Sequence, residues 1–303
     1  SGLTYIVGTT VTFNDTLDSS STSGNTDNDA LYVVGNAVFN GLVGGTTTLG
    51  GLDVSGTTTL NGDGTNPMVV STTGSQTYDN TITLGADTTL NAKGLDAQAI
   101  VLGAHDLTIN ESGTAASTPA GSIAGIISGT GALTMSGSGE LTLAGANTYS
   151  GDTTISSGRL IVTGTLNNGG AVKVLTNGTY EVAATDTIGS LEGAGDVVIN
   201  ASQTLSTGAN NASTTVSGAI SGDGNLTKVG NGTLTLAGAN TYTGNTTIST
   251  GGLTLTGTLG DDGTGTGSYA GNISNSGTLT INTAADQALS GVISGAGSFA
   301  QTG

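Results

Sequence analysis

This chain of 303 residues contains no cysteine and no tryptophan, and only four basic residues oppose 21 acidic ones. The lack of cysteine excludes a disulfide framework and leaves open an intracellular protein or an exported bacterial one. The formal charge of −17 has the wrong sign for binding phosphate backbones, which excludes nucleic acid as a partner. Apolar runs such as residues 99–102 fall far short of the ~20 residues that span a bilayer, so we predict no membrane insertion.

Helix-forming residues are also scarce. Gly accounts for 54 positions, more than twice its usual share of about 7%, and charged residues make up 8% of the chain. The mean hydropathy of +0.11 and recurring Val, Ile and Leu argue against disorder. With 3% aromatic residues, the core must be thin and built from many small layers. We therefore predict an elongated all-β protein.

The sequence repeats itself. Leu-Thr-Leu-Ala-Gly-Ala-Asn-Thr-Tyr at 141–149 recurs unchanged at 234–242, and the match extends on both sides, over about 125–166 and 218–259. A partial copy occupies 291–303. Self-similarity of this kind is typical of solenoids, in which each repeat stacks on its neighbours.

The repeated unit Gly-x-Gly-x-Leu-Thr-Leu-x-Gly-x-Asn-Thr-Tyr resembles the autotransporter-associated β-strand repeat of bacterial surface and secreted proteins. The segment 188–197 resembles another common passenger segment, and the resemblance covers roughly residues 120–303. It implies a right-handed parallel β-helix at the bacterial cell surface or outside the cell, usually with an adhesive or structural role.

The residues of the unit support a solenoid independently. Alternation places Leu141 and Leu143 on one face of a strand and Thr142 on the other. Glycines that recur after eight residues, Gly129 and Gly137 in the first copy, supply turn positions with positive φ. Strand plus tight turn is the predicted building step.

Two regions differ in repeat type. Residues 121–303 carry the passenger-type repeats, whereas residues 1–120 are rich in Thr and Gly, with Gly-Thr-Thr-Thr-Leu at 45–49 and again at 56–60. The first region fits either a continuation of the solenoid, which we favour, or a distinct small β-sandwich.

Catalytic motifs are missing. The one histidine, His105, is followed by Asp106, and no Gly-x-Ser-x-Gly elbow occurs. The acidic pairs lie in Gly-, Asn- and Ser-rich stretches that are typical of turns, and polysaccharide lyases would need basic groups that are scarce here. We predict no enzymatic activity and no catalytic residues.

Calcium is the one cofactor that the sequence leaves open, because Ca²⁺ prefers carboxylate, amide and backbone oxygens. Donor-dense turns supply the candidate ligands. These are Asp27, Asp29, Asp63, Asp261 and Asp262. None matches the spacing of an EF-hand.

The Asn-Thr-Tyr segments raise the question of sugar binding, because aromatic faces stack on sugars. A structural role is the stronger interpretation: Asn147 and Asn240 would satisfy backbone groups at turns, and Tyr149 and Tyr242 would cap a thin core with their hydroxyls in water.

We therefore expect a non-enzymatic extracellular structural protein that self-associates head to tail into a surface filament or matrix fibre. One end would add a strand to the other by β-augmentation. The assembly residues are expected to be Leu3, Tyr5, Ile6 and Val7 at one end and Ile293 and Phe299 at the other. The alternative is an adhesin or stalk passenger fragment of a larger autotransporter-like protein, with a surface glycan or a cell-surface receptor as its partner. The start at Ser1-Gly2, without Met or an apolar leader, fits a mature exported protein or a fragment.

Overall fold

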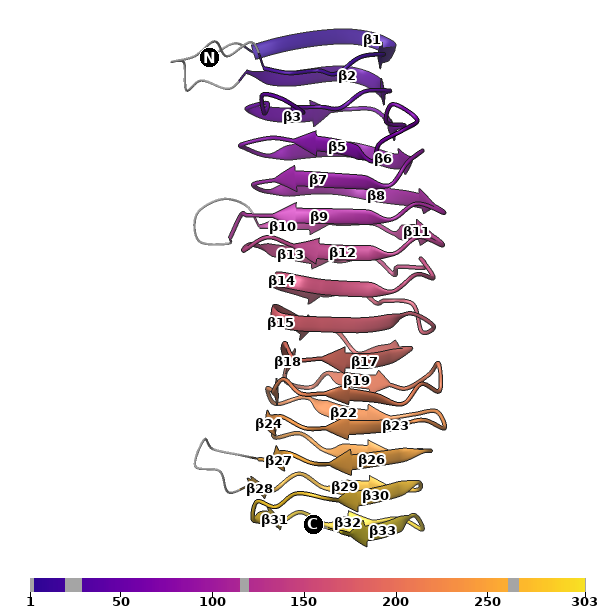
Figure 1. The fold of residues 1–303 in the computed structure, drawn as a ribbon, viewed down its shortest axis with the longest axis vertical. Coiled ribbons are helices and arrows are strands. Elements are labelled where there is room, and N and C mark those ends of the chain that lie inside the picture. Colours follow the sequence, from indigo (N-terminus) through magenta and orange to yellow (C-terminus); the bar gives the residue numbers. More distant parts are fainter. Residues whose placement is uncertain (1–2, 20–28, 115–119, 261–266, 303) are drawn as a thin grey trace. The chain divides into compact units, whose positions relative to one another are not determined.

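The computed structural model describes residues 3–19, 29–114, 120–260 and 267–302. Across these residues the chain is all-β and contains no helix. It divides into two compact units, Ser1–Gly151 and Asp152–Gly303. Each unit is a parallel β-solenoid, as expected, drawn in Figure 1 as a stack of strand layers.

The first unit is built from thirteen strands in its described residues. Their bounds are β1 Leu3–Phe13, β2 Ala30–Phe39, β3 Gly51–Val54, β4 Thr58–Leu60, β5 Met68–Ser71, β6 Gln76–Leu84, β7 Thr88–Ala92, β8 Leu95–Gly103, β9 Leu107–Glu111, β10 Gly121–Ile123, β11 Ile127–Gly129, β12 Leu133–Ser136 and β13 Glu140–Leu143. In one parallel ladder β1 pairs with β2, β2 pairs with both β3 and β4, these two pair with β6, and β6 pairs with β8. A second parallel ladder runs through β5, β7, β9 and β12.

The second unit is built from twenty strands in its described residues. Their bounds are β14 Thr153–Val162, β15 Ala171–Val182, β16 Asp186–Ile188, β17 Ser190–Gly193, β18 Asp196–Ile199, β19 Thr204–Thr207, β20 Thr214–Val216, β21 Ile220–Ser221, β22 Asn225–Lys228, β23 Thr233–Leu236, β24 Ala239–Asn240, β25 Thr246–Ile248, β26 Gly252–Leu255, β27 Thr258–Leu259, β28 Gly267–Tyr269, β29 Ile273–Asn275, β30 Thr278–Ile281, β31 Gln287–Leu289, β32 Ile293–Ser294 and β33 Ser298–Gln301. A six-stranded parallel sheet, β16-β19-β22-β25-β29-β32, forms one side of its coils.

Parallel pairing stacks equivalent residues of successive coils. In the second unit Leu234 pairs with Leu253, and Leu253 pairs with Leu279. In the first unit Leu31 pairs with Leu52, and Gly121 pairs with Leu141. In these pairs one coil takes 19 to 26 residues, and residues at equivalent positions lie above one another.

The core follows the alternation that the sequence predicts. Leu141 and Leu143 are fully buried, and Thr142 between them points outward. The second copy repeats the arrangement with Leu234 and Leu236 inside. Because Leu, Ile and Val fill most of the inward positions, an apolar core runs through the described coils of each unit.

Glycine is required at the corners between strands. Gly137 and Gly222 have φ values of +91° and +97°, which side-chain-bearing residues rarely adopt. A Cβ on Gly137 would also collide with the carbonyl oxygen of Glu111, one coil earlier. The eight-residue glycine spacing thus marks positive-φ corners, as predicted: Gly129 and Gly230 also have positive φ.

The Thr-rich first 120 residues belong to the same architecture. Strands β2, β3, β6 and β8 pair in parallel register, and the two Gly-Thr-Thr-Thr-Leu segments lie within the coils of this stack. Continuation of the solenoid is confirmed for the described residues of this region, and a separate sandwich is not formed. The division at residue 120 by repeat type stays a prediction.

Candidate functional site

The signature residues of the repeat lie inside the coils. Asn147 is buried, accepts the backbone N–H of Ile127 on its Oδ1 at 2.9 Å, and donates from Nδ2 to the carbonyl of Gly145 at 3.0 Å. Asn240 makes the equivalent bonds to Ile220 and Gly238. The structural interpretation of these asparagines is confirmed, because no ligand can reach side chains that the backbone already occupies.

The tyrosines of the signature are buried too, and the prediction that their hydroxyls lie in water is wrong for Tyr242. Tyr242 is fully buried, and its hydroxyl lies 2.7 Å from Oγ1 of Thr246 rather than in water. Thr246 also contacts the hydroxyl of Tyr269, whose ring packs edge-on against Tyr242 with centroids 5.5 Å apart. A buried phenol needs a hydrogen-bond partner, and here the coils supply it. Desolvation accordingly raises the pKa of Tyr242 well above its usual value.

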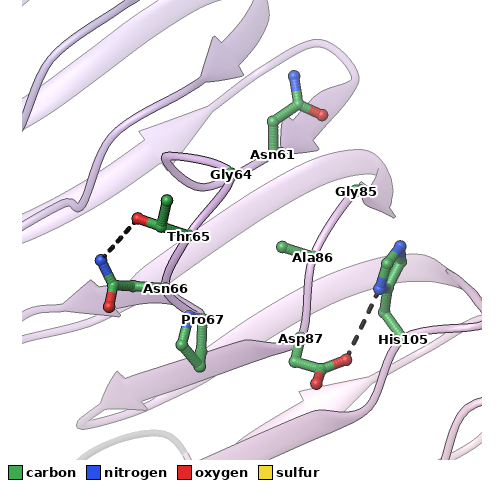
Figure 2. A pocket seen from close by; sticks show the side chains of 9 residues that line it. All are labelled: Asn61, Gly64, Thr65, Asn66, Pro67, Gly85, Ala86, Asp87 and His105. Atoms are coloured by element: carbon green, nitrogen blue, oxygen red, sulfur yellow. Dashed lines mark hydrogen bonds and ion pairs between the residues drawn. The ribbon is translucent and has the colours of Figure 1, made fainter.

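A pocket opens on the side of the first unit where one connection is longer than its neighbour. Seven residues, 61–67, link β4 to β5, whereas three residues, 85–87, link β6 to β7 in the next coil. The longer connection forms a wall over the shorter one, and the space between them has a volume of 330 Å³ (Figure 2).

The wall of the pocket is held by Asp63. Its Oδ1 accepts the N–H groups of Thr65 and Asn66, both at 2.8 Å, and its Oδ2 accepts from Nδ2 of Asn66 at 2.9 Å. These hydrogen bonds lower the pKa of Asp63 well below its usual range. The carboxylate therefore fixes the turn that carries Thr65, Asn66 and Pro67 into the pocket (Figure 2).

The opposite side of the pocket carries the histidine. Nδ1 of His105 lies 3.6 Å from Oδ1 of Asp87, and both side chains are partly exposed, at 37% and 60%. The same Oδ1 accepts the N–H of Asp106 at 3.0 Å. His105 was singled out by sequence with Asp106 beside it, but its partner in space is Asp87 in the preceding coil. The pairing of Asp87 with His105 could be predicted only if the length of this coil were known.

The candidate calcium ligands are not brought together where the structure describes them. Asp27, Asp261 and Asp262 lie outside the described residues. Asp29 borders a cavity near Ser19, and Asp63 serves its own turn. Within the described residues no group of three or more acidic or histidine side chains is arranged to hold a metal ion. Calcium binding stays a prediction.

Asp186 and Lys228 are ionisable side chains at core positions of the second unit. Asp186 is 3% exposed, and its Oδ2 accepts the N–H of Leu166 at 2.9 Å; burial raises its pKa to about 6. Lys228 is 1% exposed and donates to the carbonyls of Val229 and Gly230, and burial lowers its pKa. Both serve backbone groups inside the coils rather than a site open to a ligand.

The predicted assembly residues are mostly exposed. Leu3, Tyr5 and Val7 on β1 are 60%, 63% and 76% exposed, whereas Ile6 points toward the interior of its coil and is partly buried. Ile293 on β32 and Phe299 on β33 are 45% and 54% exposed. No helix in the described part of the chain could cross a membrane.

The two segments that carry the buried Asn and Tyr residues lie in or beside a known type of repeat. Residues 128–162 and 226–255 match the passenger-associated-transport repeat. The resemblance to autotransporter passenger repeats is thereby confirmed for both copies. The match confines itself to these two segments.

One curated relative is an adhesin. The chain is 41% identical over 113 residues to the adhesin BmaC autotransporter of Brucella suis biovar 1 (strain 1330). The matched segment is 34% of this chain but 3% of the adhesin's length. No solved structure matches the chain significantly.

Proposed function

We propose that this chain is a passenger segment of a larger bacterial surface protein and that it contributes to adhesion outside the cell. The observation that carries the proposal is the pair of passenger-associated-transport repeats, together with the similarity to an autotransporter adhesin. Because the shared signature is buried, it accounts for stacking of coils, and the outward-facing side chains are left for recognition.

A non-enzymatic role agrees with the side-chain chemistry. His105 faces a carboxylate, Asp87, but no serine hydroxyl is hydrogen-bonded to it among the described residues. Nucleophilic catalysis requires a base within hydrogen-bond reach of its nucleophile. The arrangement therefore favours binding over bond cleavage.

Two measurements test this proposal. An antiserum against the 303-residue chain should label intact cells of the source bacterium without permeabilisation. Beads coated with the chain should adhere to host epithelial cells more than beads coated with an inert protein of similar charge. Labelling only after permeabilisation, or adhesion no greater than the control, would overturn it.

Head-to-tail self-association is a second candidate. It is favoured by the exposed apolar side chains on β1 (Leu3, Tyr5, Val7) and on β32 and β33 (Ile293, Phe299). In the described residues β1 pairs only with β2, so its other edge is available to a further strand. Coils of the same longer polypeptide would satisfy these edges equally well, which is why we place adhesion first.

Analytical ultracentrifugation tests whether a second copy of this chain pairs with the free edge of β1. Self-association predicts concentration-dependent polymers that disappear when residues 1–7 are deleted. The control is Val101→Lys, which changes an apolar side chain of 37% exposure on β8, away from the β1 edge, and should not affect polymers. A chain that stays monomeric at high concentration would exclude self-association.

A further inference from the structure

We propose that the pocket between residues 61–67 and the turn 85–87 binds one sugar unit of a neutral glycan. The inference rests on the adhesive function proposed above and assigns it a site. The starting observation is one connection that is longer than its neighbour, because insertions in stacked repeats form loops on one face, which is often the binding face. Here the insertion is four residues longer than the equivalent connection in the next coil, seven against three.

The pocket is preformed. Asp63 fixes the wall through bonds to Thr65 and Asn66, and Asn61 is anchored by donating from Nδ2 to Oδ1 of Asn40 at 2.8 Å. A rigid wall matters because ordering a loop on binding would consume part of a small ligand's affinity. Gly85 keeps the floor open, since a Cβ there would collide with Oδ1 of Asn61.

Four side-chain atoms of the residues that line the pocket have no hydrogen-bond partner among the described residues. They are Oδ1 of Asn61, Oδ1 of Asn66, Oδ2 of Asp87 and Nε2 of His105. Figure 2 shows these four side chains around the pocket, with Ala86 and Pro67 adding apolar surface. Three of the four atoms are acceptors, and neutral imidazole can donate or accept.

This donor and acceptor set selects the class of ligand. Acceptors need O–H or N–H donors, which a neutral sugar offers on adjacent carbons. Carboxylate, sulfate and phosphate groups are disfavoured, because Asp87 and the neighbouring Asp106 place negative charge at the pocket and the whole chain carries −17. A volume of 330 Å³ is at the lower end of pockets that hold small molecules, which suits one sugar unit and millimolar affinity.

The chain offers a reporter for the test, because His105 is its one histidine and gives a single imidazole Cε1–H resonance. We would titrate the 303-residue chain with methyl β-galactoside, with methyl N-acetyl-β-glucosaminide and with the methyl glycoside of N-acetylneuraminic acid. At least one neutral glycoside should shift the His105 resonance to saturation at millimolar concentrations. The acidic glycoside should bind at least fivefold more weakly.

Matched variants separate binding from structural damage. Asp87→Ala removes the acceptor of the Asp106 N–H, and Asp106→Ala removes the acceptor of the Ala132 N–H one coil later, at 2.8 Å. Each variant loses one hydrogen bond between a side chain and the backbone at the same corner, but only Asp87 lines the pocket. The dissociation constant should rise at least fivefold in Asp87→Ala and stay unchanged in Asp106→Ala.

The proposal is overturned if no neutral glycoside saturates the shift, if both variants lose binding equally, or if zinc chloride saturates the shift and no glycoside does. Its failure differs from that of the adhesive function. Coated beads that adhere equally well with Asp87→Ala would exclude the pocket as the adhesive site, whereas sugar binding without any bead adhesion would leave the pocket intact and reject adhesion.

Discussion

Burial of Asp186 makes the stability of the second unit depend on pH in an unusual direction. Its pKa rises from the ordinary 3.8 to about 6, chiefly because the carboxylate is desolvated, and the N–H groups of Leu166 and Thr187 offset only part of that cost. The folded state therefore binds a proton more tightly than the unfolded state does. The stabilisation is fully present below pH 3.8 and is lost as pH rises through 6.

The magnitude follows from the shift. A shift of about two pKa units changes the free energy of unfolding by about 3 kcal/mol between a pH well below 3.8 and a pH well above 6. Measurements are best begun near pH 4.5, because the chain has a pI near 4.1 and carries little net charge below that pH. Between pH 4.5 and 7.5, Asp186 alone should lower the free energy of unfolding by about 2 kcal/mol.

The variant Asp186→Asn isolates this contribution from the other carboxylates. The amide keeps an oxygen for the N–H of Leu166 but turns its NH₂ toward the N–H of Thr187, which costs a fixed amount at every pH. We predict that the difference in free energy of unfolding, variant minus wild type, rises by about 2 kcal/mol from pH 4.5 to 7.5.

Urea titrations followed by circular dichroism at pH 4.5, 6.0 and 7.5 would measure this difference. The converse variant, Asn240→Asp, puts a carboxylate where an amide now accepts the N–H of Ile220, and should lose stability as pH rises. A difference for Asp186→Asn that stays constant within about 0.5 kcal/mol across this range would refute the assignment of a raised pKa.

Three further predictions concern the core and the acidic turns. Met135 of the first repeat copy occupies the position that Lys228 has in the second, so Lys228→Met is a natural substitution there. It should raise the free energy of unfolding, measured by urea titration, by about 1–2 kcal/mol, because it removes a buried cation. A loss of stability would show that the hydrogen bonds of Lys228 to two carbonyls outweigh the cost of its desolvation. Leu236→Asp should cost about 3–5 kcal/mol and Thr235→Asp under about 1 kcal/mol, and equal losses would contradict the inward and outward assignment. If the acidic turns hold calcium, EDTA should lower the melting temperature by several degrees, and an unchanged melting curve would reject the metal.

The sequence was sufficient for the fold because local rules repeat in it. Alternation at Leu141, Thr142 and Leu143 predicts the strand and its buried face, and the glycines eight residues apart predict positive-φ corners. Both signals depend on neighbours in the chain, and stacking then multiplies them coil by coil.

The pocket and the buried polar groups depended on which residues stack, and that was harder to predict. Asp87 reaches His105 only because one coil has a particular length, and Tyr242 finds Thr246 and Tyr269 only once the next coil is in place. For Lys228 the signal was present, because it alternates with Leu226 and so shares its inward face. The polar character of the side chain obscured that pattern.

The same stacking accounts for a composition rich in hydroxyls and poor in charge. Parallel register places equivalent side chains of successive coils above one another, about 4.8 Å apart. Like charges at that distance repel by about 1 kcal/mol even in water, and the cost recurs at every step of a column. The outward column on the six-stranded sheet of the second unit is accordingly Thr187, Ser206, Thr227, Thr247, Ser274 and Ser294. Asp87 and Asp106 do follow one another in adjacent coils, at a corner where each carboxylate accepts a backbone N–H. Carboxylates that could distinguish one partner from another are therefore tolerated at corners and inserted loops, which is where the pocket lies.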